Sequence, residues 1–314
     1  GSSTAAVLSA GSIMAPVLAL MGIDAVTSGS IIAMGALLGM IAPPVNTAAL
    51  IICAGIDVPY VGFEGPLALI TFPLAILFVL LLGYKQARHM DYEKLKPALE
   101  KQDAIRKQYG VRIYIPLLVL VALMVIFKVL KLGEDIGMPL MFLISAAVGL
   151  FTGKKINVLT AVPEAIRTAA PVMGILMGVG MFIEVMTATG VRGLVVISCL
   201  RLPSTLWLLA CAISIPLFGA VSSYGACSVL GVPFAYIYAS LLGGNSVVVL
   251  AAISLIAAVG DMMPPTALAG LFAAQVTGVE KYTEILKRCI VPIIILLVYA
   301  CFFLANSKLI AGLF

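Results

Sequence analysis

Long stretches without a charged residue fill most of the sequence and predict helices that cross a membrane. A membrane-spanning helix needs about 20 apolar residues, so a chain of 314 residues allows roughly eight to eleven membrane segments. The charge-free runs include residues 1–23, 25–56, 65–84, 113–127, 136–153, 168–183, 202–260, 262–279 and 289–307. The pattern therefore predicts an all-α polytopic membrane protein.

One polar segment interrupts this pattern and gives the chain an orientation. Residues 85–112 hold eight Lys or Arg and four Asp or Glu residues. Cytoplasmic loops of membrane proteins carry an excess of basic residues, so we expect this connector in the cytoplasm. The connector suggests four parts: a first repeat (1–84), the polar connector (85–111), scaffold helices of a second repeat (112–202), and a second hairpin with a broken helix and a last span (203–314).

Two distant stretches of the chain share small features in the same order. A serine pair, a glycine and a proline pair recur at shifts of 220, 220 and 221 residues. The matched features are Ser2-Ser3 with Ser222-Ser223, Gly11 with Gly231, and Pro43-Pro44 with Pro264-Pro265. The orientation set by the connector places the first proline pair in a segment that runs from inside to outside, and the second in a segment that runs from outside to inside. The sequence therefore predicts two inverted repeats.

Each proline pair predicts a broken transmembrane helix. Proline lacks the amide donor and clashes with the preceding turn, and the freed carbonyls cannot face lipid. They must be buried in protein or line a hydrated cavity, where they can bind a cation together with Asn46, Thr47 and Thr266. A structural kink is the plain alternative for either pair. The charge-free run 202–260 is too long for one span and suits a re-entrant hairpin with its tip at Ser222-Ser223.

Composition excludes several functional classes. Hydrophobic residues make up 62% of the chain and charged residues 11%, with a net charge of +5. A soluble domain carries roughly 25% charged residues, so a soluble enzyme or a nucleic-acid binder is not expected. The six cysteines lie in apolar surroundings and we interpret them as packing residues. We expect Trp207 and the tyrosines to be mostly anchors at the membrane edge.

Two acidic residues are expected at membrane depth. Asp261 directly precedes the second break, and Glu184 lies near the outer end of its span. A carboxylate there is costly unless it is paired, hydrated or protonated, which makes Asp261 a candidate cation ligand or proton carrier. A hydrated cap of the following turn is the alternative.

The motifs resemble the large membrane subunit of TRAP (tripartite ATP-independent periplasmic) transporters. The resemblance rests on the stretches GSSTAAVLSAGSIMAPVLALMGI, GALLGMIAPPVNTAAL, MFIEVMTATGVRGLV, VSSYGA and MMPPTALAGLF. It implies an elevator-type permease in a bacterial or archaeal inner membrane, which imports a small organic carboxylate with sodium. It also implies a periplasmic substrate-binding protein and a small four-helix membrane subunit as partners. Family members usually extend further at the N-terminus, so we expect this chain to be truncated there.

The resemblance also implies a set of site residues. It implies sodium as the coupling ion and no other cofactor. The first sodium site would use Ser2, Ser3, Pro43, Asn46 and Thr47. The second would use Ser222, Ser223, Gly225, Pro264 and Thr266. Substrate or proton contacts would come from Ser3, Ser223, Tyr224 and Asp261.

Other functional classes remain as alternatives. A single-component sodium- or proton-coupled anion symporter or antiporter shares the plan of hairpins and broken helices. An intramembrane enzyme is more remote, because the chain has no HExxH motif and a single histidine. A channel is also remote, since paired broken helices fit alternating access better than an open pore.

Overall fold

The computed structural model describes residues 2–88, 110–129, 138–152, 157–191 and 206–314, with isolated positions between them. In these ranges the regular structure is helical, which confirms the expected all-α class. The contacts divide the chain into two units, Gly1–Asp91 with Val172–Phe314, and Tyr92–Pro171. Most of the predicted connector 85–111 lies outside the described residues. The boundaries that we drew for the repeats stay a prediction.

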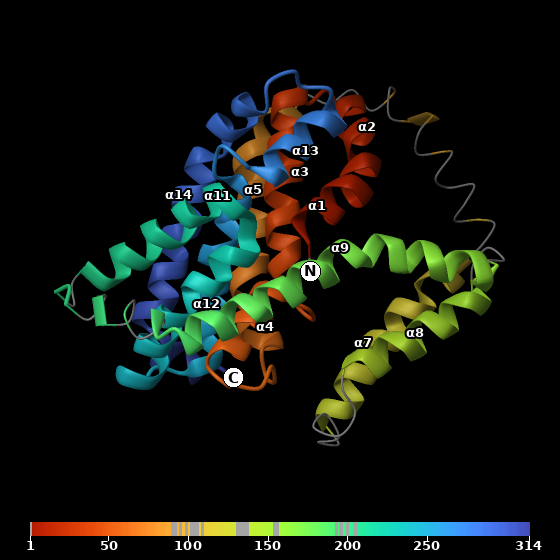
Figure 1. Ribbon diagram of the computed structural model, residues 1–314. Coiled ribbons are helices and arrows are strands. Elements are labelled where there is room, and N and C mark those ends of the chain that lie inside the picture. Colours follow the sequence, from red (N-terminus) through yellow and green to blue (C-terminus); the bar gives the residue numbers. More distant parts are fainter. Residues whose placement is uncertain are drawn as a thin grey trace. The chain divides into compact units, whose positions relative to one another are not determined.

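The first unit begins with three helical pieces that follow one another directly, α1 (Ser3–Ala6), η1 (Val7–Gly11) and α2 (Ser12–Leu20). Its other elements, labelled in part in Figure 1, are α3 (Ala25–Ile41), α4 (Thr47–Gly55), α5 (Glu64–Ala87), α11 (Trp207–Ala235), η4 (Tyr236–Leu241), α12 (Ser246–Ala258), η5 (Val259–Met262), α13 (Leu268–Thr277), α14 (Tyr282–Ala305) and α15 (Ser307–Ala311). Helix α9 (Val158–Ala188) crosses the boundary between the units.

Helix α12 lies at the centre of the first unit. Every residue from Val248 to Ala258 is buried. The helix packs against α3, α4, α5, α11 and α14. A helix that is apolar on all sides is stable only where protein surrounds it. The helix that leads into the second proline pair is therefore the best-enclosed element of this unit.

The outer helices of the first unit have apolar faces that protein does not cover. In the part of the chain that the structure describes, three helical segments are long and apolar enough to span a membrane: Ser3–Leu20, Glu64–Ala87 and Tyr282–Ala305. Large apolar side chains project outward from the last two, at Phe72, Ile76, Val79, Leu80, Ile290, Val291, Ile294, Val298 and Phe302. Lipid is the solvent that suits such faces, and the structure is consistent with a multi-pass membrane protein.

The second unit contains a packed helix pair. Helices α7 (Ile115–Val129) and α8 (Met138–Thr152) contact each other, after a short 3-10 turn, η2 (Gly110–Tyr114). The Ser145 hydroxyl donates to the Pro116 carbonyl at 2.7 Å and ties the two helices together. Leu117, Leu118 and Leu143 are exposed on this pair. The pair therefore also presents an apolar surface.

A polar cluster joins the start of α3 to the end of α5. The Asp24 carboxylate caps α3 by accepting from Thr27 N–H at 2.8 Å, and it also accepts from the Gln86 amide. Asp24 N–H donates back to Gln86 Oε1 at 3.0 Å. Burial raises the pKa of Asp24. The hydrogen bonds from Thr27 and Gln86 and the positive charge of Arg288 together lower it by more, so the pKa lies below its usual value. This end of the unit is next to the basic connector.

Helix α11 is sharply bent. A methyl group added at Gly219 would lie 2.3 Å from the Cys227 sulfur. In a straight helix, eight residues rise about 12 Å, so these two positions could not touch. The helix is therefore sharply bent between Gly219 and Cys227, and a re-entrant hairpin at this place stays a prediction. The side chains of the expected tip residues Ser222, Ser223 and Tyr224 lie outside the described residues.

The two stretches predicted to be repeats have the same element boundaries at a constant shift of 221 residues. Helix α3 runs from Ala25 to Ile41, and α12 with η5 runs from Ser246 to Met262. The helices after the breaks, α4 and α13, begin at Thr47 and Leu268. Each leading helix also begins with a side-chain cap, from Asp24 and Asn245. These matches support the internal repeat, and its inversion across the membrane stays a prediction.

A close contact recurs in both copies as well. A methyl group at Gly11 would lie 2.7 Å from Ile32 Cγ2, and one at Gly231 would lie 2.7 Å from Ile253 Cγ2. Only glycine allows the hairpin arm to approach the following helix this closely. The glycine pair that we singled out in the sequence therefore has the same packing role in both copies.

Candidate ion and substrate site

The two proline pairs end their leading helices. Helix α3 ends at Ile41, and five residues separate it from α4. In the second copy η5 ends at Met262, and five residues again separate it from α13. Both Pro-Pro bonds are cis. The breaks differ in exposure, since Pro43 and Pro44 are half-buried whereas Pro264 and Pro265 are exposed. Broken helices are thus present at both expected positions.

Asn46 organises the first break. Its side-chain oxygen accepts from Ala49 N–H at 3.0 Å and caps α4. Its side-chain nitrogen donates to the Ser254 hydroxyl of α12 at 2.7 Å. Asn46 is fully buried. An amide oxygen has two lone pairs, so the cap bond leaves room for the cation contact that we expected. Its immediate role in the structure is to join the first break to α12.

A tyrosine hydroxyl lies at each break, which the sequence interpretation missed. The Tyr60 hydroxyl donates to the Pro44 carbonyl at 3.2 Å, and the Tyr282 hydroxyl donates to the Pro265 carbonyl at 3.4 Å. These tyrosines are 222 residues apart, close to the repeat shift. Extending the repeat comparison beyond the proline pairs would have found them. At these two positions the membrane-anchor interpretation of tyrosine was incomplete.

Asp261 is fully buried beside the second break. It lies in η5 and accepts a hydrogen bond from the Ser3 hydroxyl, which belongs to α1. The neighbouring Gly260 lies against Gly219 and Cys227 of α11. Two segments from opposite ends of the chain thus converge on one carboxylate. A buried ionisable residue in a membrane protein is a candidate functional residue.

Thr266 and Gly219 link the second break to the bent helix. The Thr266 hydroxyl donates to the Gly219 carbonyl at 3.1 Å. Ala267 has φ +31° and begins α13 without a side-chain cap, at the position that corresponds to Asn46. A left-handed conformation is strained for alanine. The second break is therefore held by different contacts from those of the first.

The structure describes the side chains of some of the remaining predicted site residues but not of others. Ser2 caps α1, Ser3 and Thr47 are buried, and Gly225 is buried in α11. Ser3 is hydrogen-bonded to Asp261, whereas Asn46 contacts Ser254, Ala49 and Tyr60. Ser222, Ser223 and Tyr224 have no described side chains, and Glu184 is exposed in α9. The two sodium sets that the resemblance implied stay predictions.

The described groups around the breaks are mainly oxygen donors. Hydroxyl, amide, carboxylate and backbone carbonyl oxygens surround the breaks, and unwound carbonyls coordinate sodium in transporters of this architecture. Over the described residues, no three His, Cys, Asp or Glu side chains gather as a group that could hold a metal ion. Oxygen donors are the ligands that hard cations prefer.

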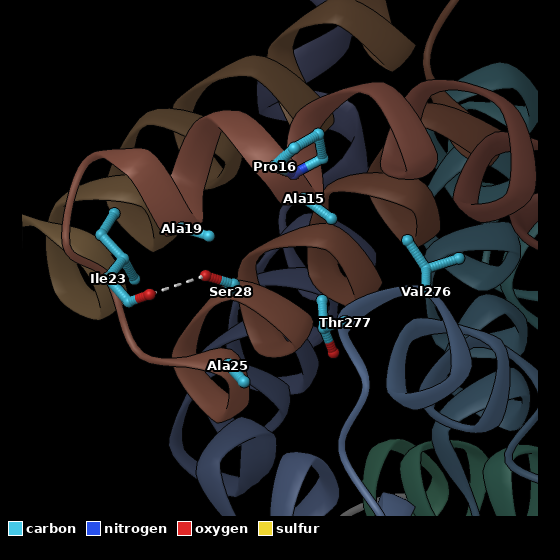
Figure 2. Close-up of a pocket in the computed structure, with 8 residues that line it drawn as sticks. All are labelled: Ala15, Pro16, Ala19, Ile23, Ala25, Ser28, Val276 and Thr277. Carbon is cyan, nitrogen blue, oxygen red and sulfur yellow. Dashed lines mark hydrogen bonds between the residues drawn. The ribbon is translucent and has the colours of Figure 1, made fainter. Parts of the chain in front are cut away.

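A cavity of about 310 Å³ lies where α2 ends and α3 begins. Figure 2 shows Ala15, Pro16 and Ala19 on one side of it, with Val276 and Thr277 opposite. Its polar lining is sparse, and the Ser28 hydroxyl donates to the Ile23 carbonyl at 3.4 Å. The cavity carries no charged lining residue and is separate from the breaks in sequence.

Paired broken helices at corresponding places in two repeats are typical of one class of protein, the multi-pass secondary transporters. Residues 1–307 match the sequence model of the family described as tripartite ATP-independent periplasmic transporter, DctM component. The chain therefore belongs to this family, whose members are the large permease components of TRAP transporters and are not enzymes. They work with a substrate-binding protein and a small membrane subunit. No curated protein matches the chain.

Asn46→Ala should destabilise the protein by about 2 kcal/mol, because it removes a helix cap and a buried hydrogen bond worth about 1 kcal/mol each. Asn245→Ala is the matched control, since Asn245 caps α12 through Val248 N–H but is exposed. It should lose about 1 kcal/mol. Chemical unfolding in detergent micelles measures both. Equal losses would show that the Ser254 contact contributes nothing.

Proposed function

We propose that this chain forms the permease part of a sodium-coupled importer of a small organic carboxylate. Family membership establishes the transporter class. The coupling ion and the substrate are the parts that we propose. The observation that carries the proposal is the pair of breaks, each with prolines, oxygen donors and a tyrosine hydroxyl at equivalent positions. Such breaks provide carbonyl oxygens for a cation at membrane depth.

Sodium would also balance the charge of the substrate. A carboxylate cannot cross the membrane interior without a compensating charge. Cations bound at the breaks, together with the N-termini of α4 and α13, supply positive potential near a substrate. The two breaks belong to one compact unit. We propose that this unit moves as a transport domain, as in an elevator mechanism.

The test is uptake by a permease that contains this chain, reconstituted in proteoliposomes with the small membrane subunit. Labelled succinate and other small carboxylates serve as probes, with the substrate-binding protein outside. The vesicle lipids should resemble those of a cytoplasmic membrane, where we propose that the permease works. We expect uptake to require both an inward sodium gradient and the substrate-binding protein. Uptake that persists when choline replaces sodium would contradict sodium coupling.

Asp261 favours one alternative, proton coupling by a symporter or antiporter. A buried carboxylate with a hydroxyl donor can exchange a proton during transport. In that case a pH gradient would drive uptake without sodium. Uptake without the binding protein would further favour a single-component carrier. The same proteoliposomes separate these outcomes from the main proposal.

A further inference from the structure

The Tyr60 hydroxyl bridges both sides of the first break. It donates to the Pro44 carbonyl at 3.2 Å and accepts from Asn46 N–H at 3.1 Å. These backbone groups lie where the regular helical bonding stops, so they need another partner. One hydroxyl can donate and accept at the same time. Tyr60 thus fixes the spacing between the proline pair and the start of α4.

The ring of Tyr60 is itself held in place. It stacks on Phe63 with centroids 4.6 Å apart and planes at 11°. Phe63 is fully buried and belongs to the core of this unit. A ring that is packed in this way cannot swing its hydroxyl away at low cost. The packing of the Tyr60 ring on Phe63 therefore determines the position of the hydroxyl.

The second break has the weaker version of the same device. The Tyr282 hydroxyl lies 3.4 Å from the Pro265 carbonyl, at the long limit for a hydrogen bond. Its partner residue Pro265 is exposed, and no side chain caps α13. The two breaks thus differ in how firmly their carbonyls are held, although they occupy equivalent places in the repeats.

We propose that Tyr60 is a positioning residue for cation binding at the first break, and that Tyr282 has the same but weaker role at the second. By holding Pro44 and Asn46, the Tyr60 hydroxyl pre-orients the unwound carbonyls and so lowers the cost of ordering them around an ion. This inference rests on the proposed sodium coupling. It adds that the ion affinity depends on a residue fourteen positions beyond Asn46.

The experiment measures the melting temperature of the purified full chain in detergent against sodium chloride, with choline chloride keeping the ionic strength constant. Tyr60→Phe keeps the stacked ring and removes the hydroxyl. We expect the sodium concentration for half-maximal stabilisation to rise about fivefold, the factor that one hydrogen bond of typical strength supplies. Tyr282→Phe should change it by less than about twofold, since its bond is long.

Tyr84→Phe is the matched control, because Tyr84 is exposed on α5. It should leave the sodium dependence unchanged. If Tyr60→Phe lowers the melting temperature equally with and without sodium, at an unchanged half-maximal concentration, its role is structural and the inference is overturned. If the wild-type chain shows no sodium-dependent stabilisation at all, the sodium proposal itself fails. The two failures are therefore distinguishable.

Discussion

Replacing Gly219 by alanine should destabilise the protein strongly. The added methyl group would lie 2.3 Å from the Gly260 Cα and 2.3 Å from the Cys227 sulfur. A backbone atom cannot move aside as a flexible side chain can, so the bent helix must separate from η5. Overpacking of this kind costs about 1–3 kcal/mol. We expect a loss at the upper end of this range, measured by unfolding in detergent micelles.

Gly35→Ala is the control for this prediction, because nothing lies within 4 Å of a methyl group at Gly35 in α3. Its stability should stay close to that of the wild type. Gly260→Ala meets mainly the Cys227 sulfur, at 2.4 Å. Adding Cys227→Ala should therefore restore part of the loss in Gly260→Ala and less of it in Gly219→Ala. Equal restoration in both would mean that the backbone contact is not the cause.

Asp261→Asn should raise the sodium concentration for half-maximal stabilisation by about tenfold or more, since a charged ligand binds a cation far better than a neutral one. The substitution keeps the shape of the side chain and an acceptor for the Ser3 hydroxyl. Glu184→Gln is the control, because this carboxylate is exposed in α9. The measurement is the melting temperature against sodium chloride.

An unchanged sodium dependence in Asp261→Asn would exclude the carboxylate as a sodium ligand. The same variant then tests the proton alternative in proteoliposomes. A carboxylate that carries a proton should, when replaced, remove the dependence of uptake on external pH. If neither the sodium dependence nor the pH dependence changes, Asp261 has only its structural bond to Ser3.

The sequence predicted the breaks well because their cause is local. Proline cannot continue a helix in any tertiary setting, and the leading helices end two residues before Pro43 and Pro264. The charge-free run of 59 residues likewise predicted an interruption, because it is too long for one span, and α11 bends sharply within this run. Helix class and break positions thus follow from composition and proline alone.

The contacts across the breaks could not be predicted, because they join residues that are far apart in the chain. Ser3 meets Asp261 and Asn46 meets Ser254, although the local pattern around each gives no sign of its partner. The resemblance grouped Ser3 with Asn46, while the hydrogen bond to Asp261 places Ser3 at the second break. The tyrosines were missed for a different reason, since an amphipathic residue at a helix end suits both a membrane edge and a break.

The bond between Ser3 and Asp261 has a consequence for how the protein is made. The two residues are 258 positions apart, and a ribosome adds about 5–20 residues per second. Ser3 must therefore wait roughly 13–50 s for its partner after it leaves the ribosome. During that time its hydroxyl, and the Asn46 amide that waits for Ser254, need temporary polar partners. The insertion machinery or water in its channel can supply them, so the first half of the unit matures only after the second half has entered the membrane.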